Sequence, residues 1–462
     1  MLPDNVLLEI FDSYRNNEQV RYRRPYTMTF KEFQWHILAH VCRRWREIVF
    51  ASPHHLKLRI VCNPRTPVRK HLDIMPAFPI VVEDTYPDYA TPDDEDNVIA
   101  ALEHADRVCD LQLKAISSKL GKVATVMRDP FPVLTRLYIS SDGTAQVFPG
   151  GFLGGSAPSL QTVHLDGIPF PSFPTFLMSA SDLVTLQLWR IPPAGYISPE
   201  ALVVGLAAFP RLKDFHMEFQ SATSRPDQLL PPPTTRTILP ALNRFEYKGA
   251  SEYLEALVAQ IDGPQLSRID IHYFNQLADF GVRQLSRFIH HSGPEITRIR
   301  HAVVIFYSGE VNFAMYPHAN DPYSYRREVI IGCKWIDWQV SHIAQVLSQF
   351  CVTLSSVVHL QLKQFLDLEE ARIDDVEWLH LLQQFPTVRT LHVNWKLAGH
   401  VALALEDISG RTATEVLPSL ELIWIGDRRI KKFDAARRVS GHPVNVCTKE
   451  EFDKRLEFYL EK

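Results

Sequence analysis

The sequence is poor in cysteine and has no paired cysteine motif. Its 6 cysteines are scattered singly over 462 residues, with no Cys-x-x-Cys pair and no histidine at zinc-finger spacing. Single cysteines in so long a chain are typical of reduced, buried thiols, so the pattern predicts neither a disulfide framework nor a zinc module. Glycine is also sparse, with 19 residues against 32 prolines, which indicates tight turns and few flexible linkers.

Long apolar runs and a strong net charge are missing as well. No apolar run approaches the length of a membrane span, and the first residues form a charged amphipathic segment unlike a signal peptide. The 49 basic and 53 acidic side chains leave a net charge of −4, so no overall field favours nucleic acid or an anionic membrane. We therefore expect a cytoplasmic or nuclear protein without nucleic-acid or membrane partners.

The sequence also lacks the signatures of common catalytic sites. It contains no Gly-x-Ser-x-Gly nucleophile elbow and no phosphate-binding loop that ends in Gly-Lys-Ser/Thr. The densest glycine cluster, at residues 150–155, has no following lysine or helix start, so we interpret it as a turn before Pro158. We expect no enzyme activity and no cofactor.

An amphipathic pattern fills the amino-terminal 60 residues. Leu7, Ile10, Phe11 and Tyr14 fall at i, i+3, i+4 and i+7, which predicts a helix with one apolar face. The same spacing recurs in Leu38, Val41, Cys42 and Trp45. Helices this short cover only part of their own apolar surface, and so small a module tends to need a partner. The pattern therefore favours an adaptor.

These residues resemble the F-box motif in a form common in fungal proteins. The match consists of Leu2-Pro3, Leu7, Ile10-Phe11 and the run Val41-Cys42-Arg43-Arg44-Trp45-Arg46. The resemblance implies binding to a Skp-type adaptor and, through it, to a cullin–RING ubiquitin ligase. The adaptor contacts that we infer are Leu2, Pro3, Leu7, Ile10, Phe11, Leu38, Val41, Cys42 and Trp45.

Two departures separate these residues from the usual F-box pattern. The connection at 15–31 is longer and more basic than usual, and the tryptophan that often follows Ser-Pro is absent after Pro53. The basic residues Arg21, Arg23 and Arg24 either contact an acidic partner or lie in a solvated loop. An ordinary helical cap on a larger domain is the alternative interpretation of the whole segment.

A short pattern of one proline and three apolar residues recurs through the rest of the chain. It reads Pro-x-apolar-x-x-apolar-x-apolar and begins at Pro132, Pro158, Pro210, Pro240, Pro264, Pro386 and Pro418. Copies without proline occupy 107–113, 182–188, 295–301 and 356–362. Most copies lie roughly 20–30 residues apart, with about twice that distance between residues 296 and 357. We interpret each copy as a short strand, and the double gap as a missing or overwritten repeat.

Helical segments follow several of these strands, at 199–208, 252–261, 282–291, 340–350 and 376–385. A strand and a helix at this period resemble leucine-rich repeats, whose stacked units bury a face that one unit cannot bury. The Asn or Cys that usually follows the strand is replaced by Asp142, Ile168, Ile191, Gln220, Ala250 or Phe274. We therefore expect irregular repeats without a buried asparagine ladder. A doubly wound α/β domain is the rival interpretation, but it does not explain the recurring strand pattern.

The expected fold class is α/β, a small helical F-box followed by an irregular leucine-rich-repeat-like solenoid. We assign 1–60 to the F-box-like domain, 61–104 to a linker and amino-terminal cap, 105–430 to the solenoid, and 431–462 to a carboxy-terminal capping strand or helix. The solenoid would carry a parallel sheet on its concave side and helices on its convex side. An acidic linker is expected at 91–96, and a terminal helix at 452–460. Segments 65–69, 152–158, 166–169 and 196–200 also resemble the body of the fungal F-box family.

Strand alternation predicts which residues face away from the core. Between the last two apolar positions stand Gln112, Tyr138, His164, Gln187, His216, Glu246, Asp270, Arg300, Gln361, His392 and Trp424. Two residues earlier stand Arg244, Arg268 and Arg298, which would stack on adjacent strands about 5 Å apart. The predicted target-binding residues are Tyr138, Arg244, Glu246, Arg268, Asp270, Arg298, Arg300 and Trp424.

This surface has two interpretations of similar weight. A mixed-charge ladder contributes little, because exposed ion pairs stabilise by roughly 0–1 kcal/mol. A recognition patch would use arginine and aromatic anchors, the side chains enriched at binding hot spots. A shared metal is not expected, because His164 and His216 lie two repeats apart, about 10 Å on strand spacing, too far for one zinc ion. The aromatic segment 306–325 is either a binding loop or a loop packed over the edge of the solenoid.

These patterns favour a non-catalytic receptor that holds a target protein for a ubiquitin ligase. The first alternative is a protein-interaction scaffold that works without a ligase. The second is an enzyme in an unrecognised α/β fold, which the missing catalytic motifs make the least favoured.

Overall fold

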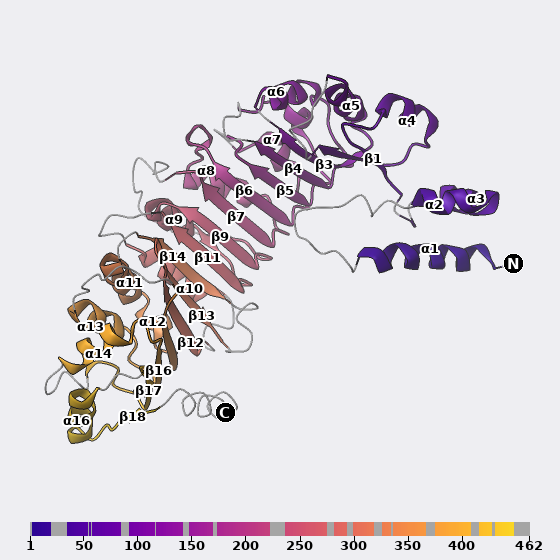
Figure 1. Cartoon of the computed structure of the whole chain (residues 1–462). Coiled ribbons are helices and arrows are strands. Elements are labelled where there is room, and N and C mark those ends of the chain that lie inside the picture. Colours follow the sequence, from indigo (N-terminus) through magenta and orange to yellow (C-terminus); the bar gives the residue numbers. More distant parts are fainter. Residues whose placement is uncertain are drawn as a thin grey trace. The chain divides into compact units, whose positions relative to one another are not determined.

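The computed structural model describes residues 2–19, 35–53, 55–56, 58–84, 92–115, 117–141, 147–169, 173–221, 236–274, 281–292, 299–317, 326–333, 336–365, 375–407, 415–426 and 430–447 (Figure 1). The chain divides into two compact units, Met1–Leu183 and Val184–Lys462. The boundary between them falls inside the segment predicted as one solenoid. Three predictions lie outside the described residues: the basic connection that contains Arg21, the Arg298 contact, and the terminal helix at 452–460.

The first unit begins with three helices, α1 (Asp4–Gln19), α2 (Trp35–Val41) and α3 (Arg43–Ala51). The rings of Phe11 and Trp45 pack with their centroids 4.7 Å apart and join α1 to α3. Outside this contact, the Arg44 guanidinium binds the Asp4 carboxylate at 2.6 Å. The Cys42 thiol accepts the Trp45 backbone N–H at 3.4 Å and caps the start of α3. The three helices expected in this stretch are therefore present, with Cys42 between α2 and α3.

A parallel sheet fills the remainder of the first unit. Its strands follow chain order as β1 (Ile60–Cys62), β2 (Ile80–Asp84), β3 (Val108–Ala115), β4 (Arg136–Ser141) and β5 (Thr162–Asp166). The connections contain α4 (Val68–Ile74), α5 (Pro92–Leu102), α6 (Ser117–Val126), the short turn η3 (Phe152–Gly155) and α7 (Thr175–Met178). Residues 61–104 thus form strand–helix units like those that follow, and the predicted linker is wrong.

The acidic segment at 92–96 is the start of α5. Val98, Ala101 and Leu102 are buried against the sheet, which supplies the apolar face that an amphipathic helix needs. Acidic side chains are favoured in the first turn, because the helix dipole places partial positive charge there. Composition suggested a linker only because the acidic residues precede the apolar ones in sequence.

The glycine cluster forms the predicted turn before Pro158. Gly154 has a φ of +59°, and a Cβ at this position would lie 2.4 Å from the backbone nitrogen of Pro130. Only glycine tolerates both the left-handed backbone and this close approach. Packing therefore explains Gly154, whereas a Cβ at Gly150 or Gly151 would meet no atom within 4 Å.

The second unit contains a mostly parallel sheet with helices along one side (Figure 1). Its strands are β6 (Thr185–Ile191), β7 (Asp214–Phe219), β9 (Arg244–Gly249), β11 (Arg268–Tyr273), β14 (Arg327–Gly332), β13 (Glu310–Tyr316), β12 (His301–Phe306), β15 (His359–Gln364), β16 (Thr390–Val393), β17 (Leu422–Trp424) and β18 (Asn445–Val446), in spatial order. A separate parallel pair joins β8 (Thr237–Ile238) to β10 (Ile261–Asp262). The mixed α/β class is confirmed.

Helices α8 (Pro199–Leu206), α9 (Ser251–Val258), α10 (Arg283–His291), α11 (Ile336–Ser348) and α13 (Asp375–Gln383) confirm the five predicted helical segments. The connections also contain η4 (Pro193–Gly195), α12 (Cys351–Leu354), α14 (Ala398–Glu406) and α16 (Lys431–Val439). None of the helices in the described ranges combines the length and apolar character that crossing a membrane requires.

The proline pattern forms a turn that sets the register of each strand. In one copy the Leu212 N–H donates to the Phe209 carbonyl at 3.2 Å, which places Pro210 at the second position of a β-turn. The Lys213 carbonyl then accepts two N–H groups from the next repeat, at 2.8 and 2.9 Å. The same double acceptance occurs at Thr135, Val184, Asn243, Arg300, Val358 and Arg389. Each strand therefore begins at a fixed level relative to its neighbour.

Buried tyrosines bind loop carbonyls in the second unit. The hydroxyls of Tyr247 and Tyr253 each donate to a loop carbonyl at 2.8 Å, those of Ala250 and Ile197. Both rings are buried, and Phe219 packs on Tyr253 at 4.8 Å between centroids. Buried tyrosine thus satisfies loop carbonyls in this part of the fold while adding apolar contact area.

The double gap in the repeat is filled by an antiparallel insertion. Strand β13 pairs antiparallel with both β12 and β14, while β14 runs parallel to β11 and β12 runs parallel to β15. Phe306 and Phe313 are buried in these strands. The prediction of a loop for 306–316 is therefore wrong, because alternating apolar residues build two central strands there; residues 318–325 lie outside the described part.

A buried arginine ties the insertion to the preceding repeat. Arg327 begins β14, and its guanidinium donates to the carbonyls of Ser267, Leu266 and Ser292, with Leu266 at 2.8 Å and Ser292 at 3.3 Å. The side chain is only 4% exposed. Because these carbonyls end the turn and helix beside β11, one guanidinium fixes β14 against that strand.

We predict that Arg327→Met lowers the free energy of unfolding by about 2–4 kcal/mol, since it leaves buried carbonyls without donors. Methionine keeps much of the apolar volume, so the loss reports the hydrogen bonds. Urea denaturation measures it, with Arg283→Met on the exposed side of α10 as the control. Equal stability of the two variants would show that Arg327 does not anchor the insertion.

Candidate functional site

The amino-terminal helices divide the predicted adaptor contacts into an inner and an outer set. Leu7 and Phe11 are buried inside the three-helix packing, and Leu38 and Trp45 are half-buried. The outer set is exposed and consists of Leu2, Pro3, Ile10, Val41 and Cys42. The inner side chains hold the helices together, so a partner would touch chiefly the outer set.

The outer set belongs to a larger exposed apolar stripe. Leu2, Ile10 and Val41 are 52%, 45% and 55% exposed. The stripe also contains three exposed residues that the contact prediction omitted, Val6, Tyr14 and Ile37. The spacing i, i+4, i+8 of Val6, Ile10 and Tyr14 was the available signal. Several exposed large apolar side chains on so small a module are typical of an interaction face.

The central strands of the second unit carry a ladder of ion pairs on the face away from the helices. Arg244 binds Glu246 through Nε at 2.7 Å, and Arg268 binds Asp270 through Nε at 2.6 Å. Arg326, directly before the next strand β14, binds Glu328 through Nη2. In each pair the acid lies two residues after the arginine, because alternate residues of a strand share a face. We call these three pairs the ion-pair ladder.

The ladder corrects the predicted arginine stack. Arg326, and not Arg298, takes the place beside Arg268, because β14 is the neighbour of β11. Arg300 is not aligned with Asp270: it stands at the entry of β12, where its carbonyl accepts the N–H groups of Val358 and His359. The recurrent Arg-x-acid spacing at 326–328 was the signal that sequence analysis missed.

Further charged groups surround the first pair of the ladder. The His216 Nδ1 lies 2.9 Å from Glu246 Oε2, and the His216 ring stacks on Trp189 with centroids 3.6 Å apart. Lys248 Nζ binds Glu218 at 2.9 Å. One connected network therefore joins β6, β7 and β9, and sequence analysis named only its Glu246 as a contact.

Burial and neighbouring charges separate the pKa values of the two central acids. Burial raises the pKa of Asp270 to about 6 against the attraction of Arg268, and Glu246 and Glu328 add to the rise. Burial by itself would also raise the pKa of Glu246, but His216 and Arg244 outweigh burial and lower the pKa of Glu246 to about 2. Near neutral pH the ladder therefore holds ionised Glu246 beside an Asp270 that takes up a proton on mild acidification.

The other predicted target contacts lie apart from the ladder. Tyr138 is in the first unit, where its ring stacks on His164 at 4.4 Å between centroids. Trp424 is on β17, and its ring packs on His392 at 4.4 Å. The eight predicted residues therefore do not form one site. Arg244, Glu246, Arg268 and Asp270 are adjacent, and the rest are separate from them or outside the described part.

Within the described ranges, no group of three or more His, Cys, Asp or Glu side chains is arranged to hold a metal ion. No protein-family model matches the sequence, and no curated protein is significantly similar to it. The function is therefore inferred from two surfaces, the apolar stripe on α1 and α2 and the polar face of the sheet.

We predict that Asp270→Asn makes stability less dependent on pH. The folded-state pKa of about 6 lies above the usual 3.8, so this group favours folding most below about pH 4 and loses that contribution as pH rises through 6. Between about pH 5 and about pH 7.5 the natural chain should lose on the order of 1–2 kcal/mol more than Asp270→Asn.

Urea denaturation at the two pH values measures this difference. The exposed Asp407, at the end of α14, provides the control variant Asp407→Asn. An unchanged pH dependence in Asp270→Asn would contradict the burial argument for this carboxyl group.

Proposed function

We propose that this chain is a non-catalytic substrate receptor of a cullin–RING ubiquitin ligase. Helices α1–α3 bind a Skp-type adaptor, and the polar face of the sheet binds a target protein. The observation that carries the proposal is the exposed apolar stripe on α1 and α2, together with the F-box-like residues that form it. Alternative partners for this stripe are outcomes of the test described below.

Burial of the stripe would supply the binding energy. Each fully buried large apolar side chain stabilises by about 1.5–3 kcal/mol relative to its exposed state. Ile10 lies on α1 and Val41 on α2. The Phe11–Trp45 contact joins α1 to α3, and α3 packs against α2, so both side chains are held in place before binding. A preorganised surface of this kind loses little side-chain entropy on association.

We also infer that the strand–helix units are irregular leucine-rich-repeat-like repeats. The recurring proline turn, the parallel strands and the helices on one side support this interpretation. The antiparallel insertion β12–β14 and the buried tyrosines are departures from a regular repeat. Such a sheet offers a broad polar face on which a target protein can be held.

The proposed activity is proximity. Tethering a target beside a ubiquitin-transfer enzyme raises their effective concentration without chemistry on the receptor itself. A scaffold that works without a ligase would use the same sheet face but would bring no cullin into its complex. Proximity labelling with and without proteasome inhibition would identify target proteins that accumulate when degradation is blocked.

We predict that the double variant Ile10→Asp, Val41→Asp weakens binding of a purified Skp-type adaptor at least about tenfold, since two charges would enter an apolar interface. Asn5→Asp adds the same charge to α1 outside the stripe and should bind normally. Titration calorimetry with the intact chain measures both. Circular dichroism confirms that the variants remain helical.

Undiminished binding by the double variant would exclude the stripe as the adaptor site. Absence of binding by the natural chain would leave the ligase-independent scaffold as the better account.

A further inference from the structure

Four neighbouring strands that the structure describes in the second unit contain no acidic residue, and Glu421, at the entry of β17, lies 3.8 Å from Arg389 in an ion pair. Strands β12, β15, β16 and β17 read HAVVIF, HLQLKQ, TLHV and LIW, without an acidic residue. Alternation and register place their outward side chains together; they are His301, Val303, Ile305, His359, Gln361, Lys363, Thr390, His392, Leu422 and Trp424. We call this the β12–β17 face.

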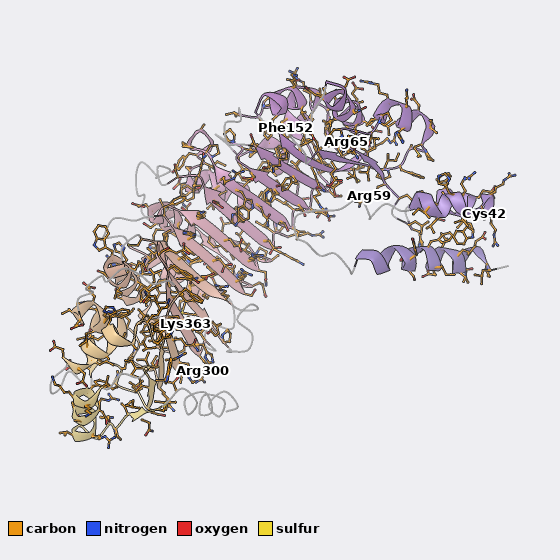
Figure 2. The ribbon with its side chains drawn as sticks, viewed as in Figure 1. Cys42, Arg59, Arg65, Phe152, Arg300 and Lys363 are labelled. Carbon is orange, nitrogen blue, oxygen red and sulfur yellow. The ribbon has the colours of Figure 1, made fainter. Side chains whose placement is uncertain are left out.

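Two cations at this face have no acidic partner. Among the residues that the structure describes, neither Arg300 nor Lys363 forms an ion pair (Figure 2). Lys363 is half-buried, and burial alone lowers the pKa of its ammonium group. A partly buried cation without a counter-charge is unfavourable, and an anion from a partner would relieve that cost.

The ion-pair ladder on the same sheet provides the contrast. Arg244, Arg268 and Arg326 are each bound by a carboxylate of their own strand. An acidic partner would have to compete with those internal acids. Charge complementarity therefore favours the β12–β17 face as the binding site of an acidic partner. The predicted arginine stack would have placed that site on the ladder.

The two cations lie near opposite ends of β15. Arg300 directly precedes β12, and its backbone lies beside the entry of β15, because its carbonyl accepts the His359 N–H at 3.0 Å. Lys363 lies near the other end of that strand, opposite Ile305. Five residue steps separate Val358 from Lys363, which corresponds to about 17 Å along a strand.

Uncharged polar groups occupy the space between the cations. The His359 and His301 rings stack with centroids 4.6 Å apart. Burial, together with the charge of Arg300, lowers the pKa of His359 to about 4, so its imidazole is neutral at neutral pH. Gln361 lies beside His392 in the next row. His301 and His359 are only 6% and 7% exposed, and the His359 Nδ1 lies 2.6 Å from the Thr390 hydroxyl. Gln361 and His392, both half-buried, are therefore the groups that can hydrogen-bond a peptide backbone without repelling acidic side chains.

We propose that the β12–β17 face binds an extended acidic segment of a target protein, with one carboxylate at Arg300 and another at Lys363. The segment runs along β15, and its two carboxylates lie about four to six residues apart, since an extended chain rises about 3.3 Å per residue. This inference rests on the proposed function in taking the sheet as the target-binding surface, and it names the class of target.

Fluorescence polarisation with the full chain tests the proposal. The probe is a labelled Gly/Ser peptide that carries two glutamates about five residues apart, and the matched probe carries glutamine at both positions. We expect the glutamate peptide to bind more tightly, with an affinity that falls as salt is added. Lys363→Gln and Arg300→Gln should each weaken binding about fivefold, as expected for the loss of one partly exposed ion pair.

Lys213→Gln is the matched control, because Lys213 is an exposed cation at the entry of β7. Its carbonyl accepts two consecutive N–H groups, those of Asn243 and Arg244, as the Arg300 carbonyl accepts those of Val358 and His359. This variant should change the affinity less than about twofold. Lys363→Arg should retain binding, and thermal unfolding verifies that each variant is folded. Equal affinity for the two peptides, or equal effects of Lys213→Gln and Lys363→Gln, would overturn the proposal.

The peptide experiment and the adaptor experiment can fail independently of each other. Adaptor binding depends on α1–α3, and peptide binding depends on β12 and β15. If the peptide binds but no Skp-type adaptor does, the acidic-segment surface stands and the ligase assignment fails. If the adaptor binds and the peptide does not, the receptor remains and its target chemistry is different.

Discussion

The fold depends most on one repeated hydrogen-bond pattern. In it, two consecutive N–H groups of one repeat donate to the carbonyl of the residue that precedes the strand of its neighbour. The pattern recurs at Lys213, Asn243, Val358 and Arg389. The preceding turn forms with proline before Lys213 and without it before Val358, where the Val357 N–H donates to the Leu354 carbonyl at 3.0 Å. Because the pattern fixes where each strand starts, it also fixes which side chains share a row. The core, the ion-pair ladder and the β12–β17 face are all consequences of that register.

Charge is distributed unevenly on the resulting face. In the ladder the arginines are neutralised on their own strands, and the network from His216 to Asp270 is largely self-contained. Beyond the insertion, Arg300 and Lys363 stand without acids among the described residues. A compensated network stabilises and orients its members, whereas an uncompensated pair of cations remains available to a partner. Of these two cations, sequence analysis predicted Arg300 as a target contact and missed Lys363.

Local patterns allowed the strands, the helices and their faces to be predicted, because turn chemistry and apolar alternation act over a few residues. The copy at 295–301 misled for the same reason. It matches the repeat pattern, yet the strand begins at His301, because pairing with β13 and β15 decides the register there. No local signal distinguishes this antiparallel insertion from another repeat. Of the predicted adaptor contacts, Ile10 and Val41 are exposed in the stripe, whereas Leu7 and Phe11 are buried. Their burial follows from helix packing, which the local sequence does not reveal.

The receptor account depends on whether α1–α3 bind a Skp-type adaptor. Titration calorimetry of the intact chain with the purified adaptor, repeated over a range of temperatures, tests this most directly. The account predicts a one-to-one complex with a clearly negative heat-capacity change, because the apolar stripe leaves water on binding. A chain that remains folded and shows no binding at any temperature would contradict it.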